Sequence, residues 1–159
     1  MPKTQEFDVR EATANDVFYA TQLAHQLVKE TGLKKSLGFD WKGCSKFAEN
    51  LLSSENCCLF VAEVDGEVVG FVAGMVSPTF FNPSGLQAGE LGWYVDPDYR
   101  NSRVATELHK SYEEWAKGRG ATSIQMMHMD TEQSELIGKM YEKWGYHKVE
   151  TSYLKEVKD

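Results

Sequence analysis

One stretch of this chain restricts its fold more than any other, because a strand, a turn and the start of a helix follow one another without a break. The strand ends at Val95, Asp96-Pro97-Asp98 forms the turn, and an amphipathic helix begins near Ser102. The first turn of a helix presents free backbone N–H groups and the positive end of the helix dipole, and Arg100 and Arg103 add charge there. The stretch therefore predicts a phosphate-holding turn, with an ordinary capped surface helix as the alternative. Its apolar residues are Leu91, Trp93, Tyr94 and Val95 on the strand and Val104, Leu108, Tyr112 and Trp115 on the helix.

These residues resemble the acetyl-CoA signature of the GNAT superfamily of N-acetyltransferases. The signature has the form Val-x-Pro-x-x-Arg, continued by Arg/Gln-x-x-Gly-x-Gly/Ala. The residues that match it at the right spacing are Val95, Pro97, Arg100 and Ala105. The chain departs from the signature at Asn101 and Arg103, where the family commonly has glycine, which lets a phosphate approach the backbone closely. Arg103 therefore either points its side chain away from the pyrophosphate or grips a phosphate with it.

The resemblance implies that acetyl-CoA (coenzyme A) is the cofactor. Its pyrophosphate would lie on backbone amides at the start of the helix, and its pantetheine arm would pair with the strand edge near Tyr94 and Val95. The N–H of Val95 would also stabilise the carbonyl oxygen as charge builds there, if the strand splays from its neighbour as it does in the family. The residues implied to hold the phosphates are Arg100, Asn101, Ser102, Arg103, Val104, Ala105 and Thr106.

A second motif lies near the end of the chain. The segment from Tyr141 to Tyr146 resembles the Tyr-x-x-x-Gly-Phe ending of the family. The resemblance implies that Tyr141 donates a proton to the departing thiolate, which a phenol can do because its ordinary pKa of about 10 keeps it protonated at neutral pH. The alternative is a core aromatic whose hydroxyl meets solvent. Ser134 stands where the family often has an asparagine against the cofactor, and it can make fewer hydrogen bonds.

The general base is less well defined by the sequence. Glu90 lies on the signature strand, where some members of the family place a glutamate. Simple alternation puts Glu90 on the same face as Tyr94 and opposite Trp93, but a bulge would change that parity. His128, Asp130 and an ordered water chain are the competing candidates.

Composition narrows the class of protein. The chain has 159 residues, 42% of them hydrophobic and 26% charged, which suits one domain over residues 1–159. With a net charge of -7 and no basic stripe, nucleic-acid binding is not expected. The three cysteines suit reduced thiols in a cytoplasmic protein, and no run is long enough to span a membrane. The four histidines are scattered, so no metal site is expected.

The order of the elements predicts an α/β (α+β) fold like that of the family. The central sheet would be mixed and mostly antiparallel, splayed at the signature strand, with helices on both faces. The predicted helices are residues 16–30, 43–54, 102–118 and 132–144, and the predicted strands are residues 7–10, 57–64, 68–76, 89–95 and 122–129, with two short strands within 146–157.

Two pairs of aromatic residues lie in the predicted connections. Phe39 and Trp41 either line an acceptor pocket or pack against the neighbouring helix. Phe80 and Phe81 either line a site or cover a sheet edge or a subunit interface.

The function predicted from the resemblance is acetyl-CoA-dependent transfer of an acetyl group directly to an amine of unknown identity. The acceptor would be a small molecule or a peptide, and the acidic charge does not choose between them. The alternative is a catalytically weak acyl-CoA-binding or partner-binding module on the same fold. Phe80, Phe81 and the C-terminal strands could form a homodimer contact.

Overall fold

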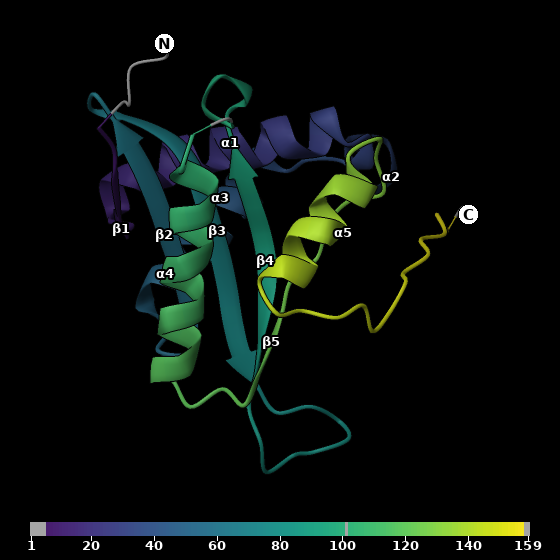
Figure 1. Cartoon of the computed structure of the whole chain (residues 1–159). Coiled ribbons are helices and arrows are strands. Elements are labelled where there is room, and N and C mark those ends of the chain that lie inside the picture. The colour runs from purple at the N-terminus through teal and green to yellow at the C-terminus, as the bar shows by residue number, and fades with distance from the viewer. Residues whose placement is uncertain (1–5, 101, 158–159) are drawn as a thin grey trace.

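A five-stranded sheet forms the centre of the computed structural model, which describes residues 6–100 and 102–157. The strands lie in the order in which they occur along the chain, and neighbours are antiparallel except for the last pair, which is parallel (Figure 1). This confirms the predicted mixed, mostly antiparallel sheet. The strands are β1 (Asp8–Glu11), β2 (Cys57–Val64), β3 (Glu67–Ser77), β4 (Gln87–Val95) and β5 (Ser123–Gln125).

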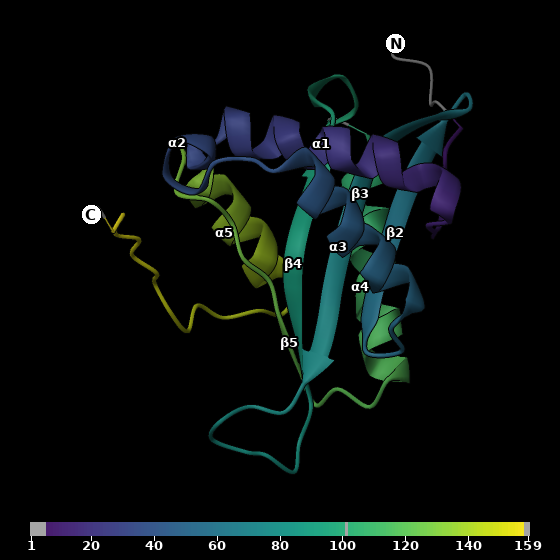
Figure 2. The ribbon, with the colours of Figure 1, turned by 180° about the vertical axis from the view of Figure 1, so that it is seen from behind.

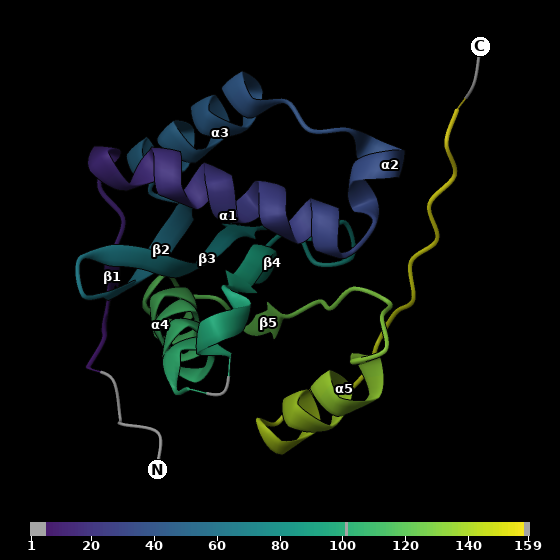
Figure 3. The same cartoon turned by 90° about the horizontal axis from the view of Figure 1, so that it is seen from above.

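Helices cover both faces of this sheet, as predicted (Figures 2 and 3). One face carries α1 (Val17–Glu30) and α3 (Trp41–Ser53), and the other carries α4 (Val104–Gly118) and α5 (Ser134–Lys143). The short elements are η1 (Ala14–Asp16), α2 (Leu33–Leu37) and η2 (Pro97–Tyr99). Within the described residues, no helix is both long and apolar enough to cross a membrane.

Each face of the sheet has its own core. On one face, Leu59, Val61 and Phe71 pack against α1 and α3, and on the other, Val72 and the buried side of α4 pack together. The helix α4 lies very close to the sheet at Gly74, where an added Cβ would be 2.4 Å from the ring of Tyr112. Because Gly74 has no side chain, α4 can lie this close to the strands that carry the site.

The connection between α1 and α3 differs from the prediction. It contains the short helix α2, and α3 begins at Trp41 because the carboxylate of Asp40 accepts a hydrogen bond from the Gly43 N–H at 3.0 Å and caps the helix. The rings of Phe39 and Trp41 lie 4.9 and 4.8 Å from the His25 ring on α1. The structure therefore places these two aromatics in helix packing.

The last part of the chain also differs from the prediction. The strand predicted over residues 122–129 is only three residues long and ends at Gln125. The hydroxyl of Tyr112 donates a hydrogen bond to the carbonyl oxygen of Gln125 at 3.0 Å. The two strands predicted within 146–157 do not form in the described residues, because this segment runs away from the sheet edge and pairs with no strand (Figures 1 and 2).

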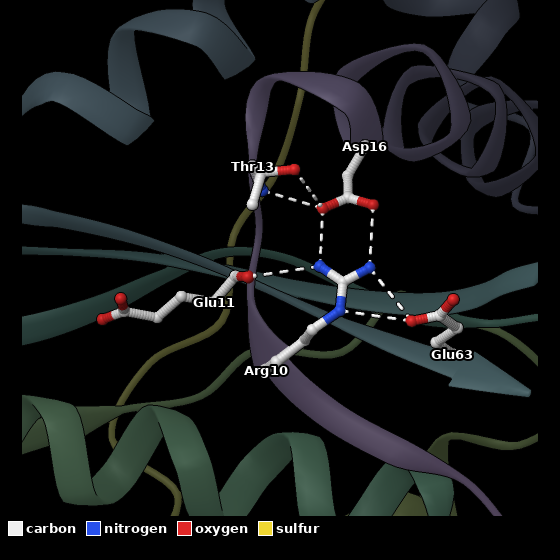
Figure 4. A network of polar contacts seen from close by, with 5 residues as sticks. All are labelled: Arg10, Glu11, Thr13, Asp16 and Glu63. Atoms are coloured by element: carbon white, nitrogen blue, oxygen red, sulfur yellow. Dashed lines mark hydrogen bonds and ion pairs between the residues drawn. The ribbon is translucent and has the colours of Figure 1, made fainter. Parts of the chain in front are cut away.

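An ion-pair network joins β1, η1 and β2 (Figure 4). The guanidinium of Arg10 donates two hydrogen bonds to the carboxylate of Asp16, at 2.7 and 3.1 Å, and two more to Glu63. The Asp16 carboxylate also accepts from the N–H of Thr13 at 2.7 Å. Hydrogen bonds from Arg10 lower the pKa of Asp16 below its ordinary value.

Replacing Asp16 with asparagine should lower the free energy of unfolding at pH 7 by about 2 kcal/mol, because it leaves Arg10 without its best partner. The depressed pKa of Asp16 means that its stabilisation is present at neutral pH and is lost as the pH falls below about 4. Urea unfolding at pH 7 and under acidic conditions measures both effects. Glu63→Gln is the matched control, and it should cost less because the Glu63 side chain is 32% exposed, against 7% for Asp16. Equal losses for the two variants would contradict this account.

Candidate active site

The site is built where β4 separates from β5. The two strands pair only from Gln87↔Ser123 to Gly89↔Gln125, and β4 then continues to Val95 without β5 beside it. The splay predicted at this strand is therefore present. The N–H of Asp96 donates to the carbonyl oxygen of Val69 on the β3 side at 2.8 Å. Because neighbouring residues of a strand direct their amides to opposite edges, the N–H of Val95 faces the open edge.

A β-bulge in β4 decides which side chains reach this edge. Gly92 pairs with Ala73, but Glu90 pairs with Gly74, so Leu91 is an extra residue on β4. The bulge reverses the alternation and places Glu90 on the α4 face, together with Trp93 and Val95. The prediction from simple alternation, which put Glu90 on the face of Tyr94, is wrong because it assumed an unbroken pleat.

Glu90 is a buried carboxyl with an altered acidity. Its exposed fraction is 6%, and burial raises its pKa to about 7 although a hydrogen bond from the Met127 backbone acts in the opposite direction. A carboxyl with this pKa exchanges its proton near neutral pH, as a general base must.

Tyr141 is connected to Glu90 through the backbone of Met127. The phenol of Tyr141 donates to the Met127 carbonyl oxygen at 2.6 Å, while the same residue's backbone hydrogen-bonds to Glu90. Burial and the charge of Glu90 raise the pKa of Tyr141 above its ordinary value. The phenol therefore holds its proton at neutral and alkaline pH. The structure brings the two predicted catalytic residues together.

An aromatic shell surrounds this pair. The Trp93 ring is stacked 6.1 Å from the Tyr141 ring, and its buried Nε1 has no hydrogen-bond partner in the described residues. The sequence identified Trp93 only as a strand residue and indicated no role for Met127. Glu90 and Tyr141 contact the backbone of Met127, and a backbone contact leaves no signal in the sequence. His128 lies 6.1 Å from Tyr141 but is exposed, and its ring contacts the Met129 carbonyl oxygen.

The predicted phosphate-holding turn lies at the start of α4. Arg103 is the N-cap residue and makes no side-chain capping bond, and the N–H of Val104 donates to the Ser102 hydroxyl at 3.3 Å. The backbone amides of Ala105 and Thr106 follow in the first helical turn, where an anion binds best. The Arg103 side chain is 74% exposed, and its guanidinium contacts the Glu107 carboxylate at 3.0 Å. The prediction for Asn101 lies outside the described residues.

Tyr94 and Arg100, which flank the turn at Asp96-Pro97-Asp98, make contacts within the protein. Arg100 donates to both carboxylate oxygens of Glu30, each at 2.7 Å, and its Nε donates to the Val95 carbonyl oxygen at 2.9 Å. Its guanidinium also lies 5.1 Å above the Tyr94 ring, on the α1 face. Arg100 therefore ties the end of β4 to the end of α1, and the Tyr94 side chain lies on the opposite face from Glu90.

The remaining candidates lie around α5. The Ser134 hydroxyl donates to the Met129 carbonyl oxygen at 3.1 Å and accepts from the Thr131 N–H at 2.9 Å, so it is engaged in the turn that begins the helix. Asp130 is exposed. All three cysteines are free, and burial raises the pKa of Cys58 to about 12, which makes it a poor nucleophile. No group of three or more metal-ligating side chains is found in residues 6–100 and 102–157.

Comparisons with known proteins agree with this architecture. Residues 20–146 match the acetyltransferase (GNAT) family model. The chain is 34% identical over 81 residues to "Aminoglycoside N(6')-acetyltransferase type 1" of Klebsiella aerogenes, a match that covers 50% of this chain and 53% of the relative. It is 29% identical over 106 residues to "Probable N-acetyltransferase camello" of Xenopus tropicalis, covering 67% of this chain and 46% of the relative. The chain therefore spans about half the length of the curated relatives that it matches.

Solved structures share the fold over nearly the whole chain. The aminoglycoside acetyltransferase AAC(6')-Iy in complex with the bisubstrate analogue CoA-S-monomethyl-acetylneamine has a TM-score of 0.76 at 18% identity, covering 97% of this chain and 99% of that one. A predicted acetyltransferase from Clostridium acetobutylicum with acetyl-CoA has a TM-score of 0.75 at 19% identity, covering 94% and 95%. At this level of identity, the likeness establishes the fold.

Proposed function

The chain belongs to the acetyltransferase (GNAT) family, and we propose that it transfers the acetyl group of acetyl-CoA directly to an amine. The observation that carries this proposal is the pair formed by Glu90 and Tyr141, which both contact the backbone of one residue, Met127, where β4 separates from β5. Glu90 is suited to accept a proton near pH 7, which attack by an amine requires. Tyr141 keeps its proton, which can then be given to the departing thiolate.

The residues present fit acetyl-CoA. The first-turn amides of α4 at Ala105 and Thr106 would hold the pyrophosphate, and the open edge of β4 would accept the pantetheine amides. When bound, acetyl-CoA supplies the thioester carbonyl. Arg100 would contribute by fixing the turn through Glu30, and Ser134 by fixing the start of α5.

The chain's own groups then account for the proton transfers. Glu90 would take the proton of the incoming amine, directly or through a water. The N–H of Val95 would donate to the carbonyl oxygen as negative charge develops on it. Tyr141 would give its proton to the departing sulfur. The proton taken up by Glu90 would then pass, directly or through water, to the Tyr141 phenolate, so that both groups return to their starting states.

A small-molecule amine is the acceptor class that we propose. Support comes from the aminoglycoside acetyltransferase of Klebsiella aerogenes among the relatives. The net charge of -7 favours the approach of a cationic amine of either class. A peptide amine is the alternative. Release of coenzyme A thiol, followed over a panel of aminoglycosides, polyamines and peptides, tests the proposal. Acetyl-CoA binding without thiol release for any amine would favour the binding-module alternative.

We also propose that the chain works as a homodimer in the cytoplasm. The three free cysteines support a reducing compartment. Phe80 and Phe81 are each 92% exposed, and adjacent apolar rings exposed to solvent support a contact between subunits.

Replacing Arg103 with glycine should weaken coenzyme A binding by about tenfold at low salt, because a charge near the phosphates is lost. Its present contact with Glu107 is an exposed ion pair that is readily exchanged for a phosphate. Calorimetric titration measures the effect, which should shrink as salt screens the charge. Glycine is tolerated at an N-cap, so the fold should persist, and Arg103→Lys should recover most of the affinity. A higher affinity in the glycine variant would show that Arg103 obstructs the cofactor.

A further inference from the structure

The end of α5 is joined to α4 by a group of polar and aromatic side chains. Of the residues of α5, all of which the structure describes, only Tyr141 is buried. In Figure 3, the helix lies at the margin of the fold. The attachment of α5 to the rest of the molecule therefore depends on Tyr141 and on the residues that follow the helix.

The chain turns back toward α4 directly after α5. Gly145 has a φ of 95°, in the left-handed region that favours glycine, and the N–H of Tyr146 donates to the Tyr141 carbonyl oxygen at 3.0 Å. This turn places the Tyr146 ring 5.8 Å and the Trp144 ring 6.2 Å from the Tyr141 ring. The two aromatic residues after the helix therefore pack around the phenol that the proposed reaction uses.

A buried histidine on α4 contacts both of these aromatic residues. The His109 side chain is 2% exposed, and its ring is stacked 4.2 Å from the Trp144 ring with an angle of 14° between the planes. Its Nε2 lies 3.0 Å from the Tyr146 hydroxyl. The same hydroxyl lies 2.9 Å from the carboxylate of Glu113, one turn further along α4. Three polar groups from two segments of the chain therefore meet at one hydroxyl.

The order of these hydrogen bonds defines the form of His109. A carboxylate can only accept, so the Tyr146 hydroxyl gives its one proton to Glu113 and accepts from the Nε2–H of His109. Burial lowers the pKa of His109 below its ordinary value, although the Glu113 carboxylate acts in the opposite direction. The ring is therefore neutral at pH 7 and carries its proton on Nε2.

We infer that His109 and Tyr146 dock α5 on α4 through this hydrogen bond and are positioning residues for Tyr141. They act by fixing the turn at the end of α5, and through it the place of the phenol, and neither is assigned a contact with the cofactor. This inference rests on the proposed function, in which Tyr141 protonates the departing thiolate. If packing of the rings alone held α5 in place, the hydrogen bond would be dispensable.

Two substitutions at His109 separate the hydrogen bond from the packing. His109→Phe keeps a ring against Trp144 but loses the donor, whereas His109→Gln loses the ring but keeps an N–H donor. We expect His109→Phe to lower kcat by about tenfold and to change the coenzyme A affinity by less than about twofold, because a displaced phenol slows proton transfer without altering the start of α4. His109→Gln should recover most of the turnover. Thiol release with the best acceptor of the panel, together with calorimetric titration, measures these effects.

Combined variants show whether the effect passes through Tyr146 and Tyr141. Tyr146→Phe removes the hydroxyl and should also lower kcat, and the double variant with His109→Phe should lose no more than Tyr146→Phe alone. In the Tyr141→Phe background, His109→Phe should not lower kcat further, because the group that it positions is already absent. Amide hydrogen exchange in α5 should be about tenfold faster in both single variants. It should be unchanged in the control Glu114→Gln, which removes an exposed carboxylate of α4.

The possible results separate this inference from the proposed function. Parental turnover and exchange in His109→Phe, or full turnover in His109→Phe with a loss in His109→Gln, would overturn the inference and show that ring packing holds α5. Faster exchange in α5 with unchanged kcat would overturn the positioning role. Absence of thiol release by the unaltered chain would overturn the proposed function and the positioning role with it. The exchange measurements need no acceptor, so they would still decide whether the hydrogen bond docks α5.

Discussion

Replacing Glu90 with glutamine is expected to lower kcat/KM by about a hundredfold or more, which is the usual loss when a positioned general base is removed. Burial raises the pKa of Glu90 to about 7, and only the carboxylate form can accept the proton of the amine. In the unaltered protein, kcat/KM should therefore rise with pH up to about 7 and then level off. The variant should lose this rise. Thiol release measured across this pH range with one acceptor amine gives both results.

The stability of Glu90→Gln is the control that shows whether a loss of activity reflects a loss of the fold. The folded protein binds a proton at Glu90 more tightly than the unfolded chain does, so this residue costs stability as the pH rises from about 4 to about 7. Glutamine carries no such cost. The variant should be at least as stable as the parent at pH 8, and more stable by at most about 3 kcal/mol, in urea unfolding. A folded variant with an unchanged pH profile would remove Glu90 from the mechanism and leave His128, Asp130 or a water chain as the base.

Replacing Tyr141 with phenylalanine is expected to lower kcat by about a hundredfold while the coenzyme A affinity changes by less than about twofold. The phenol proton is needed when the thiolate leaves and not when the cofactor binds. Because burial and Glu90 raise the pKa of Tyr141, the parent should show no loss of activity up to about pH 10. Steady-state kinetics and calorimetric titration separate the two parameters.

The structural cost of this variant is small and can be measured. It removes the hydrogen bond to the Met127 carbonyl oxygen, which should lower stability by about 1 kcal/mol. Tyr19→Phe is the matched control because this α1 phenol is 50% exposed, and it should change neither turnover nor stability. Turnover of Tyr141→Phe equal to that of the parent would show that another group, or water, protonates the sulfur.

The regular elements could be predicted from the sequence because their signals are local. The hairpin of β2 and β3 follows from two apolar runs around Asp65-Gly66, and α1 and α4 follow from apolar residues at helical spacing. The bounds were less accurate where tertiary contacts decide them. The strand after α4 ends at Gln125 instead of residue 129, and nothing in its composition marks that end.

The candidate site shows which information a single sequence lacks. The motifs located the start of α4 and Tyr141, but the face on which Glu90 lies depends on one extra residue at Leu91 that no local pattern reveals. The engagement of Arg100 with Glu30 joins residues 70 positions apart, so it too appears only in three dimensions. The two strands predicted within residues 146–157 do not form in the described residues, and no local pattern in that segment marks the difference.

Calorimetric titration with acetyl-CoA and with free coenzyme A tests the central claim most directly, because it requires no knowledge of the acceptor. We expect saturable binding of both by the unaltered chain, and loss of both in Ala105→Asp. An acidic residue in the first turn of α4 favours the helix dipole but repels the phosphates. Because Ala105 is half-buried against the core, urea unfolding of the variant is the control that shows it is folded. Absence of binding by the unaltered chain, or equal binding by Ala105→Asp, would contradict the assignment of the turn and of acetyl-CoA.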